Sequence, residues 1–360
     1  MSLKTRLPLI AAIILTSASA FAAGVPVAVV APSQGPFAAL GRQIADGAVA
    51  RIEADGNTAV LVEEPCAAEG NEAVAEKITG AKAAAAIGFL CSETLESALP
   101  ALKEAGIPAL TVSVRATILM EDALKNGWPF FRLAPADGAE TSRIIDFILS
   151  DWAGQPLGLV EDGTIHGREM TEAIRNALEE RGLKPAFVDT YRPGQEQQIS
   201  LVRRLSRAGV THVFIGGDRN DAAIIARDAK AEGLTLELLG GDAMNAANQT
   251  VPLSDGVRAA TLPDWAADPQ NAQLVEQLHA KGIVPEGYVL PAYAAAAIAG
   301  EAAGLAAGEG KPMAEALLMK AFDTALGPVR FTDGHELTEN PYRVLEWRGN
   351  AFAAPAPPTD

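Results

Sequence analysis

The strongest constraint on the fold of this chain is an alternation of short apolar runs with amphipathic helical segments, which occurs in two separate series. The first series lies between residues 25 and 112, and the second between residues 141 and 239. Apolar runs joined by helices are typical of parallel strands in a sheet that helices cover on both faces. The sequence therefore predicts an α/β chain with two sheets. In the first series, strands and helices are expected in turn at 25–30, 37–54, 59–62, 72–80, 84–89, 93–105 and 109–112.

The loops at the carboxyl ends of the expected strands are the places to look for function. Ligands of parallel sheets bind there because helix N-termini and free backbone amides point to that edge. In this chain the loops are expected at 31–35, 91–94, 113–117, 161–166, 216–220 and 240–243.

The first residues have the parts of a secretory signal peptide in the required order. Lys4 and Arg6 form a basic start, an apolar stretch follows at 7–15, and small residues end in Ala20-Phe21-Ala22. The apolar stretch is too short to span a bilayer, and the alternative is a buried N-terminal helix. We expect a signal peptide at 1–22 that is removed on export to the periplasm.

The chain is strongly acidic, with 29 Lys and Arg against 45 Asp and Glu. Removing Lys4 and Arg6 with the signal peptide leaves 27 against 45, a net charge of −18. Such a surface repels nucleic acid and anionic lipid. Glycines and a glutamate interrupt the alanine-rich stretch 292–307, so no later segment is expected to span a membrane. We therefore expect no nucleic-acid partner and no direct membrane insertion.

The chain has two cysteines, Cys66 and Cys91. An even count in an exported protein favours a disulfide over two buried free thiols. In the chain-entropy description, a bridge that closes a loop of this length stabilises the fold by roughly 3 kcal/mol.

The motifs of common enzyme classes are missing from the sequence. It has no G-x-S-x-G turn and no H-E-x-x-H pair, and the segment 308–312 lacks the leading glycine and the Ser or Thr of a phosphate-binding loop. The four histidines are not spaced as metal ligands, and no Cys/His cluster is present. We expect no catalytic residue, no metal and no cofactor. A hydrolase assembled from distant loops is the enzyme alternative.

Four residues in the strand-end loops have side chains suited to a small charged ligand. Ser92 begins a helix after a buried strand, where its hydroxyl and the nearby amides can hold a carboxylate or simply cap the helix. Asp218 and Asp242 each follow a Gly-Gly pair, so either can approach a ligand ammonium or cap a turn. Arg115 lies among small residues and is either an anion clamp or a solvated side chain.

Several further segments occur in a consistent order along nearly the whole mature chain. They are Val27–Pro36, a following helix with Gly41 and Gly47, Ile87–Ser92, Gly106–Pro108, Phe131-Arg132, Asp268-Pro269, Gly327-Pro328, Phe331 and the closing Tyr342–Phe352. Together they resemble the branched-chain amino-acid-binding (Leu/Ile/Val-binding-like) proteins of ABC importers. The resemblance implies a type I periplasmic-binding-protein fold, in which two Rossmann-like lobes are joined by three crossover segments and the ligand lies in the cleft between them.

The resemblance also implies where the chain passes between the lobes and that Cys66 and Cys91 are bridged. The crossovers are expected near 134–137, 262–266 and 328–331. The expected parts are 23–135 plus 266–328 for the first lobe, 136–265 plus 329–352 for the second lobe, and 353–360 for a frayed tail.

The resemblance implies roles for the candidate residues. Ser92 matches the position that receives the ligand carboxylate, and Asp242 matches an acidic position that receives the α-ammonium. The loop 113–115 matches a segment that contacts the amino acid, and a small gap would bring Thr117 into the place of Arg115.

The chain departs from leucine-binding relatives at three positions where they have tyrosines. These positions are occupied by Leu40, His166 and Asp218. We therefore expect His166 and Asp218 to face the ligand from the second lobe, in a pocket more polar than one built for leucine. The alternative is that other side chains hold the same ligands.

These observations predict a monomeric periplasmic protein that closes its lobes around a small polar solute, either an amino acid or a related carboxylate or amide. The closed form would deliver this solute to the membrane permease of an ABC importer. The alternative outside transport is a periplasmic sensor that passes the closed state to a signalling partner.

Overall fold

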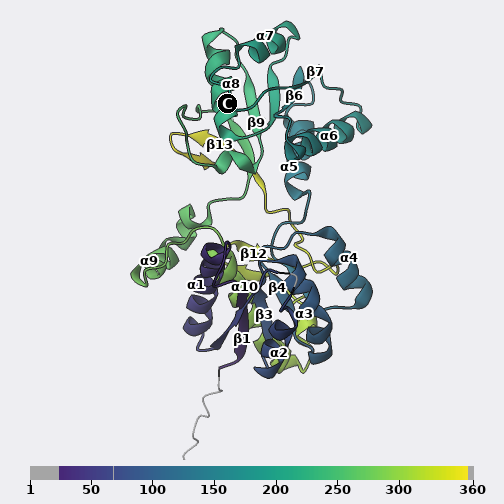
Figure 1. Cartoon of the computed structure of the whole chain (residues 1–360), viewed down its shortest axis with the longest axis vertical. Helices are drawn as coiled ribbons and strands as arrows, with labels where there is room; N and C mark the ends of the chain where they lie inside the picture. The colour runs from purple at the N-terminus through teal and green to yellow at the C-terminus, as the bar shows by residue number, and fades with distance from the viewer. Residues whose placement is uncertain (1–23, 68, 356–360) are drawn as a thin grey trace, which may run out of the picture.

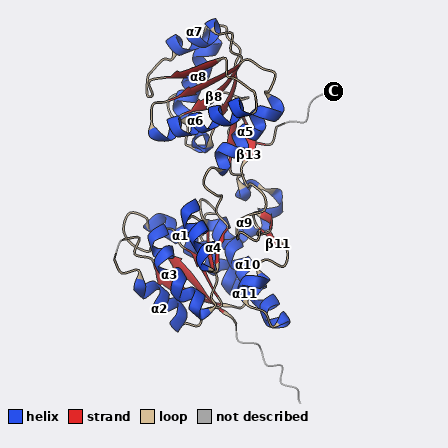
Figure 2. Ribbon diagram, turned by 90° about the vertical axis from the view of Figure 1, so that its right-hand side faces the viewer, coloured by secondary structure: helices blue, strands red, loops and turns tan. Residues whose placement is uncertain are grey.

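The protein is an elongated molecule of two lobes joined by extended segments (Figure 1). The computed structural model describes residues 24–67 and 69–355. The expected signal peptide at 1–22 and the end of the expected tail, 356–360, lie outside the described residues. In each lobe, helices lie on both sides of a central sheet (Figure 2), as the two series of apolar runs predict.

The first lobe is built on a five-stranded, fully parallel sheet with the order β2-β1-β3-β4-β5. Its strands are β1 Pro26–Ala31, β2 Thr58–Glu63, β3 Ala85–Gly88, β4 Ala109–Thr111 and β5 Phe130–Arg132. The helices that pack with it are α1 Ala38–Ala54, α2 Glu72–Gly80, α3 Ser92–Ala105, α4 Thr117–Asn126, α9 Ala272–Ala280, α10 Val289–Glu309 and α11 Met313–Ala316.

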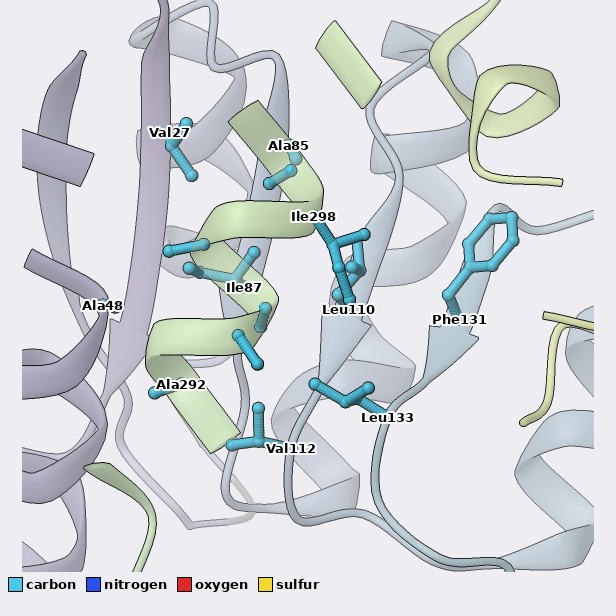
Figure 3. Packing of buried hydrophobic residues seen from close by; sticks show 14 of the residues in the cluster. Val27, Ala48, Ala85, Ile87, Leu110, Val112, Phe131, Leu133, Ala292 and Ile298 are labelled. Atoms are coloured by element: carbon cyan, nitrogen blue, oxygen red, sulfur yellow. The ribbon is translucent and has the colours of Figure 1, made fainter. Parts of the chain in front are cut away.

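Both faces of this sheet are buried. Successive residues of a strand point to opposite faces, and here the residues on each face are apolar. Val27 and Val29 of β1 pack with α1 and α10, whereas Ala28 and Val30 pack with α2 and α3. Figure 3 shows α10 crossing the first of these faces, with Ile298 among the strand residues. A strand buried on both faces has no polar face, which explains the continuous apolar runs.

The second lobe has a seven-stranded sheet with the order β14-β13-β10-β9-β8-β6-β7. Its strands are β6 Leu157–Glu161, β7 Phe187–Thr190, β8 His212–Gly216, β9 Glu237–Gly240, β10 Arg258–Thr261, β13 Arg343–Arg348 and β14 Ala351–Ala353. β13 and β14 are antiparallel to their neighbours, and the other pairs are parallel. The helices are α5 Ala139–Asp151 and α6 Ile165–Glu180 on one face, and α7 Ile199–Arg207 and α8 Arg219–Ala231 on the other.

Three elements differ from the sequence predictions. The helix α4 and the strand β10 were not predicted, because α4 has only ten residues and β10 has only four, two of them alanines. The sequence also predicts a helix over 313–324, but α11 ends at Ala316 and the strand β11 Phe322–Thr324 follows. This strand pairs with β12 Gly327–Val329 in a small antiparallel sheet. The hydrogen bonds between these two strands stabilise β11 as a strand, and the helix propensity of its own residues does not reveal them.

The third crossover lies later in the chain than the expected position at 328–331. Val329 and Phe331 belong to the core of the first lobe, and the ring of Phe331 meets that of Phe131 edge-on at 5.3 Å. The chain reaches the second lobe near Asn340, whose side-chain amide donates to the carbonyl of Ala139 at 2.7 Å. Residues 329–337 therefore pack with the first lobe, because their apolar side chains complete its core.

Among the described residues, α10 is the one helix that is long and apolar enough to cross a membrane, with a mean hydropathy of 1.4 over its most apolar window. The sequence prediction excluded any such segment, and by composition alone that exclusion was wrong. More than half of this window is buried, and Ala292, Ala295 and Ile298 pack in the core of the first lobe. The part of the helix from 289 to 300 is apolar on nearly all sides because protein surrounds it, whereas exposed residues occur from Glu301 onward.

The predicted disulfide between Cys66 and Cys91 is confirmed, with Cα atoms 5.4 Å apart and a sequence separation of 25. It joins the loop after β2 to the residue before α3. The two strands that lead to these cysteines are not adjacent in the sheet, so the bridge ties together loops on either side of β1.

A substitution at Gly47 tests the close packing of α1 on α10. A Cβ atom at Gly47 would lie 2.0 Å from the carbonyl oxygen of Val289, so Gly47→Ala should force the helices apart and destabilise the protein by about 2 kcal/mol. Gly304→Ala is the matched control, because this glycine of α10 has no atom within 4 Å of the added Cβ. The control should stabilise by about 0.5–1 kcal/mol. Urea unfolding measures both, and equal effects of the two substitutions would contradict this packing.

Candidate functional site

The candidate site lies where the loop after β4 meets the second lobe. Arg115 follows β4, and its Nη1 donates to the hydroxyl of Tyr342 at 2.9 Å. Tyr342 is attached to the second lobe, since its carbonyl accepts a hydrogen bond from Nε of Arg143 in α5 at 3.0 Å. The contact between Arg115 and Tyr342 therefore joins the two lobes at the inner end of the space between them.

Arg115 carries a positive charge at this junction. Burial opposes that charge, but the neighbouring Tyr342, Tyr288 and Asp242 outweigh the effect, so the pKa of Arg115 is raised. Tyr288 belongs to the first lobe and Asp242 to the second. Groups from both lobes thus stabilise the charged form of the guanidinium, as expected for an arginine that binds an anion between the lobes.

Asp242 begins a short 3-10 helix, Asp242–Asn245, at the end of β9. Its Oδ1 accepts a hydrogen bond from the hydroxyl of Thr261 at 2.7 Å and another from the side-chain amide of Asn245 at 3.2 Å. These bonds fix the orientation of the carboxylate. A carboxylate held in one place can receive a ligand ammonium without first losing conformational freedom.

Glu140 in the first turn of α5 is a member of the site that sequence reasoning missed. Its Oε1 accepts the backbone N–H of Asp242 at 2.7 Å, and a Cβ added to Gly241 would lie 2.1 Å from this oxygen. Burial raises the pKa of Glu140, and the charge of Asp242 adds to the increase, while that N–H, His166 and Arg115 oppose it. Glu140 follows a crossover and not a strand, so the search of strand ends did not include it.

A cavity of about 260 Å³ lies between these groups, and Arg115, Glu140, His166 and Tyr342 are in its walls. The structure thus brings the predicted Arg115 and His166 to one cavity, with Asp242 directly behind Glu140. Arg115 occupies the interlobe position, whereas Thr117, the alternative for that place, begins α4.

A second cavity of about 310 Å³ shares Arg115 with the first and has mainly apolar walls. All three crossovers contribute to it, through Leu133 to Pro135, Leu262 with Pro263, and Leu337 with Thr338. The other walls include Leu40, Val112, Trp265, Tyr288 and Leu326. Leu40 was expected in a pocket more polar than one for leucine, but on the first-lobe side the space is apolar.

Ser92 and Asp218 are not among the residues that line these two cavities. Cys91, not Ser92, is the N-cap of α3, so the hydroxyl of Ser92 is not used as the cap. Asp218 is the N-cap of α8 and accepts the N–H of Asp221 at 2.9 Å, which was the structural alternative for this residue. Contact of Ser92 or Asp218 with a ligand stays a prediction.

Glu64 holds the loop that leads to Ser92. Its carboxylate is only 1 % exposed and accepts the backbone N–H groups of Leu90 and Cys91, at 2.8 and 2.9 Å. Burial raises the pKa of Glu64 to about 7, although the two N–H groups oppose the shift. Glu63 and Glu64 are adjacent acidic residues in the sequence, and the sequence alone does not show that one of them is buried, because its burial depends on the tertiary fold.

Among the described residues, one group of potential metal ligands clusters together, namely Glu64 with Cys66 and Cys91. Both sulfurs are joined in the disulfide, so neither offers a thiolate to a metal.

The chain matches the periplasmic binding protein family over residues 24–351. It belongs to that family. The predicted resemblance and the predicted two-lobed fold are thereby confirmed, and the family is one of solute-binding proteins, not of enzymes. This finding agrees with a site made of fixed charges beside an apolar space.

Relatives with assigned ligands cover almost the whole chain. A leucine-, isoleucine-, valine-, threonine- and alanine-binding protein of Pseudomonas aeruginosa is 26 % identical over 343 residues, which are 91 % of each chain. A Leu/Ile/Val-binding protein homologue of Brucella abortus is 28 % identical over 341 residues, again 91 % of each. A putative branched-chain amino acid ABC transporter protein of Rhodospirillum rubrum has a similar structure, with a TM-score of 0.78, 20 % identity and coverage of 92 % of this chain and 99 % of that one.

The raised pKa of Glu64 predicts how stability depends on pH. The pKa is about 7 in the folded chain against 4.5 for a free glutamate, so between these values the folded state keeps a proton that the unfolded state has lost. Stability should therefore fall as pH rises from 4.5 to 7, by on the order of 3 kcal/mol. Urea unfolding of Glu64→Gln should lack this loss, and the exposed Glu179→Gln should keep it. Parallel pH profiles of all three proteins would contradict the assignment.

Proposed function

We propose that this protein captures an amino acid with an apolar side chain in the periplasm and delivers it to the membrane permease of an ABC importer. The observation that carries the proposal is the placement of opposite charges across the junction of the lobes, next to an apolar cavity. The assigned ligands of the relatives from Pseudomonas aeruginosa and Brucella abortus support the same class.

The charges match the two ends of a zwitterion. Arg115 comes from the first lobe, and Asp242 with Glu140 comes from the second. A guanidinium pairs with a carboxylate through two parallel hydrogen bonds, and the carboxylate of Asp242 suits an ammonium. An amino acid placed between them pairs its carboxylate with the first lobe and its ammonium with the second lobe.

The apolar cavity accounts for the side chain of the ligand. Its volume of about 310 Å³ and its walls of leucine, valine and aromatic residues suit a branched or compact apolar group. Burial of such a group contributes about 1.5–3 kcal/mol. The polar contacts then set which end of the molecule faces which lobe.

Closure follows from this division of contacts. A ligand that touches both lobes binds the closed form more tightly than the open form, and only this difference in affinity shifts the population. Export through the signal peptide at 1–22 places the protein where such a ligand enters the cell. The closed form presents both lobes together to the permease.

Binding of L-leucine, followed by calorimetry and thermal unfolding of the mature protein, tests this function. We expect L-leucine to raise the melting temperature, because a ligand of the folded state stabilises it. Arg115→Met should weaken binding by about 2 kcal/mol, the usual loss for a hydrogen bond to a charged group. Arg207→Met, on the exposed surface of the second lobe, should bind as the unchanged protein does.

A second ligand separates the ammonium site from the rest of the pocket. 4-Methylpentanoate has the carboxylate and the branched body of leucine but no ammonium. Asp242→Asn keeps the acceptor oxygen for Thr261 and removes the charge, so it should weaken leucine and leave 4-methylpentanoate unchanged or tighter. Equal losses for both ligands would remove Asp242 from the ammonium site, and no binding by any apolar amino acid would overturn the proposed function.

A further inference from the structure

Arg132 is a buried arginine at the end of β5, where the first crossover begins. The residue is 1 % exposed and among the largest fully buried side chains. A charge removed from water to this degree needs partners that replace its hydration. The identity of those partners determines what the side chain holds together.

The guanidinium of Arg132 binds two segments that are distant in sequence. Its Nη1 donates to the carbonyl oxygen of Arg115 at 2.5 Å and to that of Ala116 at 3.1 Å. Its Nη2 forms an ion pair with Glu336. The carbonyl of Arg115 accepts a second hydrogen bond, from the N–H of Asp137 in the first crossover at 3.2 Å. The backbone of the loop that carries Arg115 is therefore fixed to the first crossover.

The same contacts fix the start of the third crossover. The N–H of Arg132 donates to the carbonyl of His335 at 3.0 Å. The ring of His335 stacks on Phe131, with centroids 4.2 Å apart. With Glu336 held by the guanidinium, the third crossover stays on the first lobe until this point, and the connecting segment begins only beyond it.

The two arginines thus hold the two ends of the third crossover. Arg132 pairs with Glu336 at its start, and Arg115 donates to Tyr342 at its end. Arg132 also holds the backbone of Arg115. A displacement of Arg115 toward a ligand therefore acts on the same segment that must bend when the lobes close.

From these contacts we infer that Arg132 is a positioning residue that couples the ligand-facing Arg115 to bending of the third crossover. The inference rests on the proposed function only in taking Arg115 as a ligand contact. Arg132 itself is buried in the first lobe and acts through the carbonyls of 115 and 116. Loss of Arg132 should release the ligand loop and the crossover together.

Hydrogen exchange of the ligand-free mature protein tests the coupling without any ligand. Arg132→Met should speed amide exchange about tenfold or more in two regions, 113–117 and 332–338, because both lose a fixed partner. Glu336→Ala should speed exchange mainly in 332–338, since the bonds from Arg132 to the carbonyls of 115 and 116 remain. Arg203→Met removes an exposed arginine–glutamate pair, with Glu232 on the second lobe, and should change neither region.

The outcome that overturns the inference is exchange at 113–117 that stays unchanged in Arg132→Met while 332–338 speeds up. The two segments would then be held independently. Should Arg132→Met fail to fold, Arg132→Lys keeps the charge with fewer donors and must show the same two regions with a smaller increase. Faster exchange confined to 332–338 in the lysine variant likewise overturns the inference.

Affinity for L-leucine distinguishes a positioning role from a merely structural one. Arg132→Met should weaken leucine about tenfold in the otherwise unchanged protein and less than about twofold when Arg115→Met is already present, because coupled residues are not additive. The same factor in both backgrounds would overturn the positioning role. If Arg115→Met alone leaves leucine affinity unchanged, Arg115 is not a ligand contact, and if no apolar amino acid binds, the proposed function fails. In either case the exchange experiment decides the coupling by itself.

Discussion

Burial of both faces of two parallel sheets is the constraint on which the rest of this structure depends. Alternate residues of β1 pack into different cores, so helices must cover each side. Covered faces leave the edge at the carboxyl ends of the strands as the place where loops, helix N-termini and free side chains meet. Two sheets built in this way, joined by three segments, place Arg115 of one lobe against Tyr342 and Asp242 of the other.

The site combines fixed charge with an apolar space, and each part comes from a different source. Asp242 and Glu140 are held by hydrogen bonds within the second lobe, so their carboxyl groups are in position before a ligand arrives. The apolar walls come largely from the crossovers, the segments that must bend when the lobes move. A ligand that fills this space therefore contacts the crossovers directly. Its apolar side chain would then affect how the crossovers bend, in addition to contributing binding energy.

The fold was predictable because its signals are local and repeated. The apolar runs and helical periods located most strands and helices, the strand-end rule led to Arg115 and Asp242, and the resemblance led to His166. The prediction failed where partners distant in sequence decide the outcome. Phe331 belongs to the first lobe because it meets Phe131, and β11 is a strand because β12 pairs with it. Neither contact can be recognised from the sequence pattern of the neighbouring residues.

The missed charged residues have the same explanation. Glu64 and Arg132 look like ordinary surface charges in the sequence, and only the assembled fold shows that both are 1 % exposed with several backbone partners each. Glu140 was missed because it follows a crossover. The prediction of a polar pocket considered three tyrosine positions and did not include the apolar crossover residues that line the second cavity.

The order of the segments along the chain also bears on how the protein folds. The core of the first lobe includes α10 and Phe331 as well as β1, and the sheet of the second lobe includes β13, which ends at Arg348. Neither lobe can complete its packing before residues 329–348 have been synthesised. Folding of each lobe must therefore bring together segments that lie far apart in the chain, and such segments pair slowly because the intervening chain has to close first.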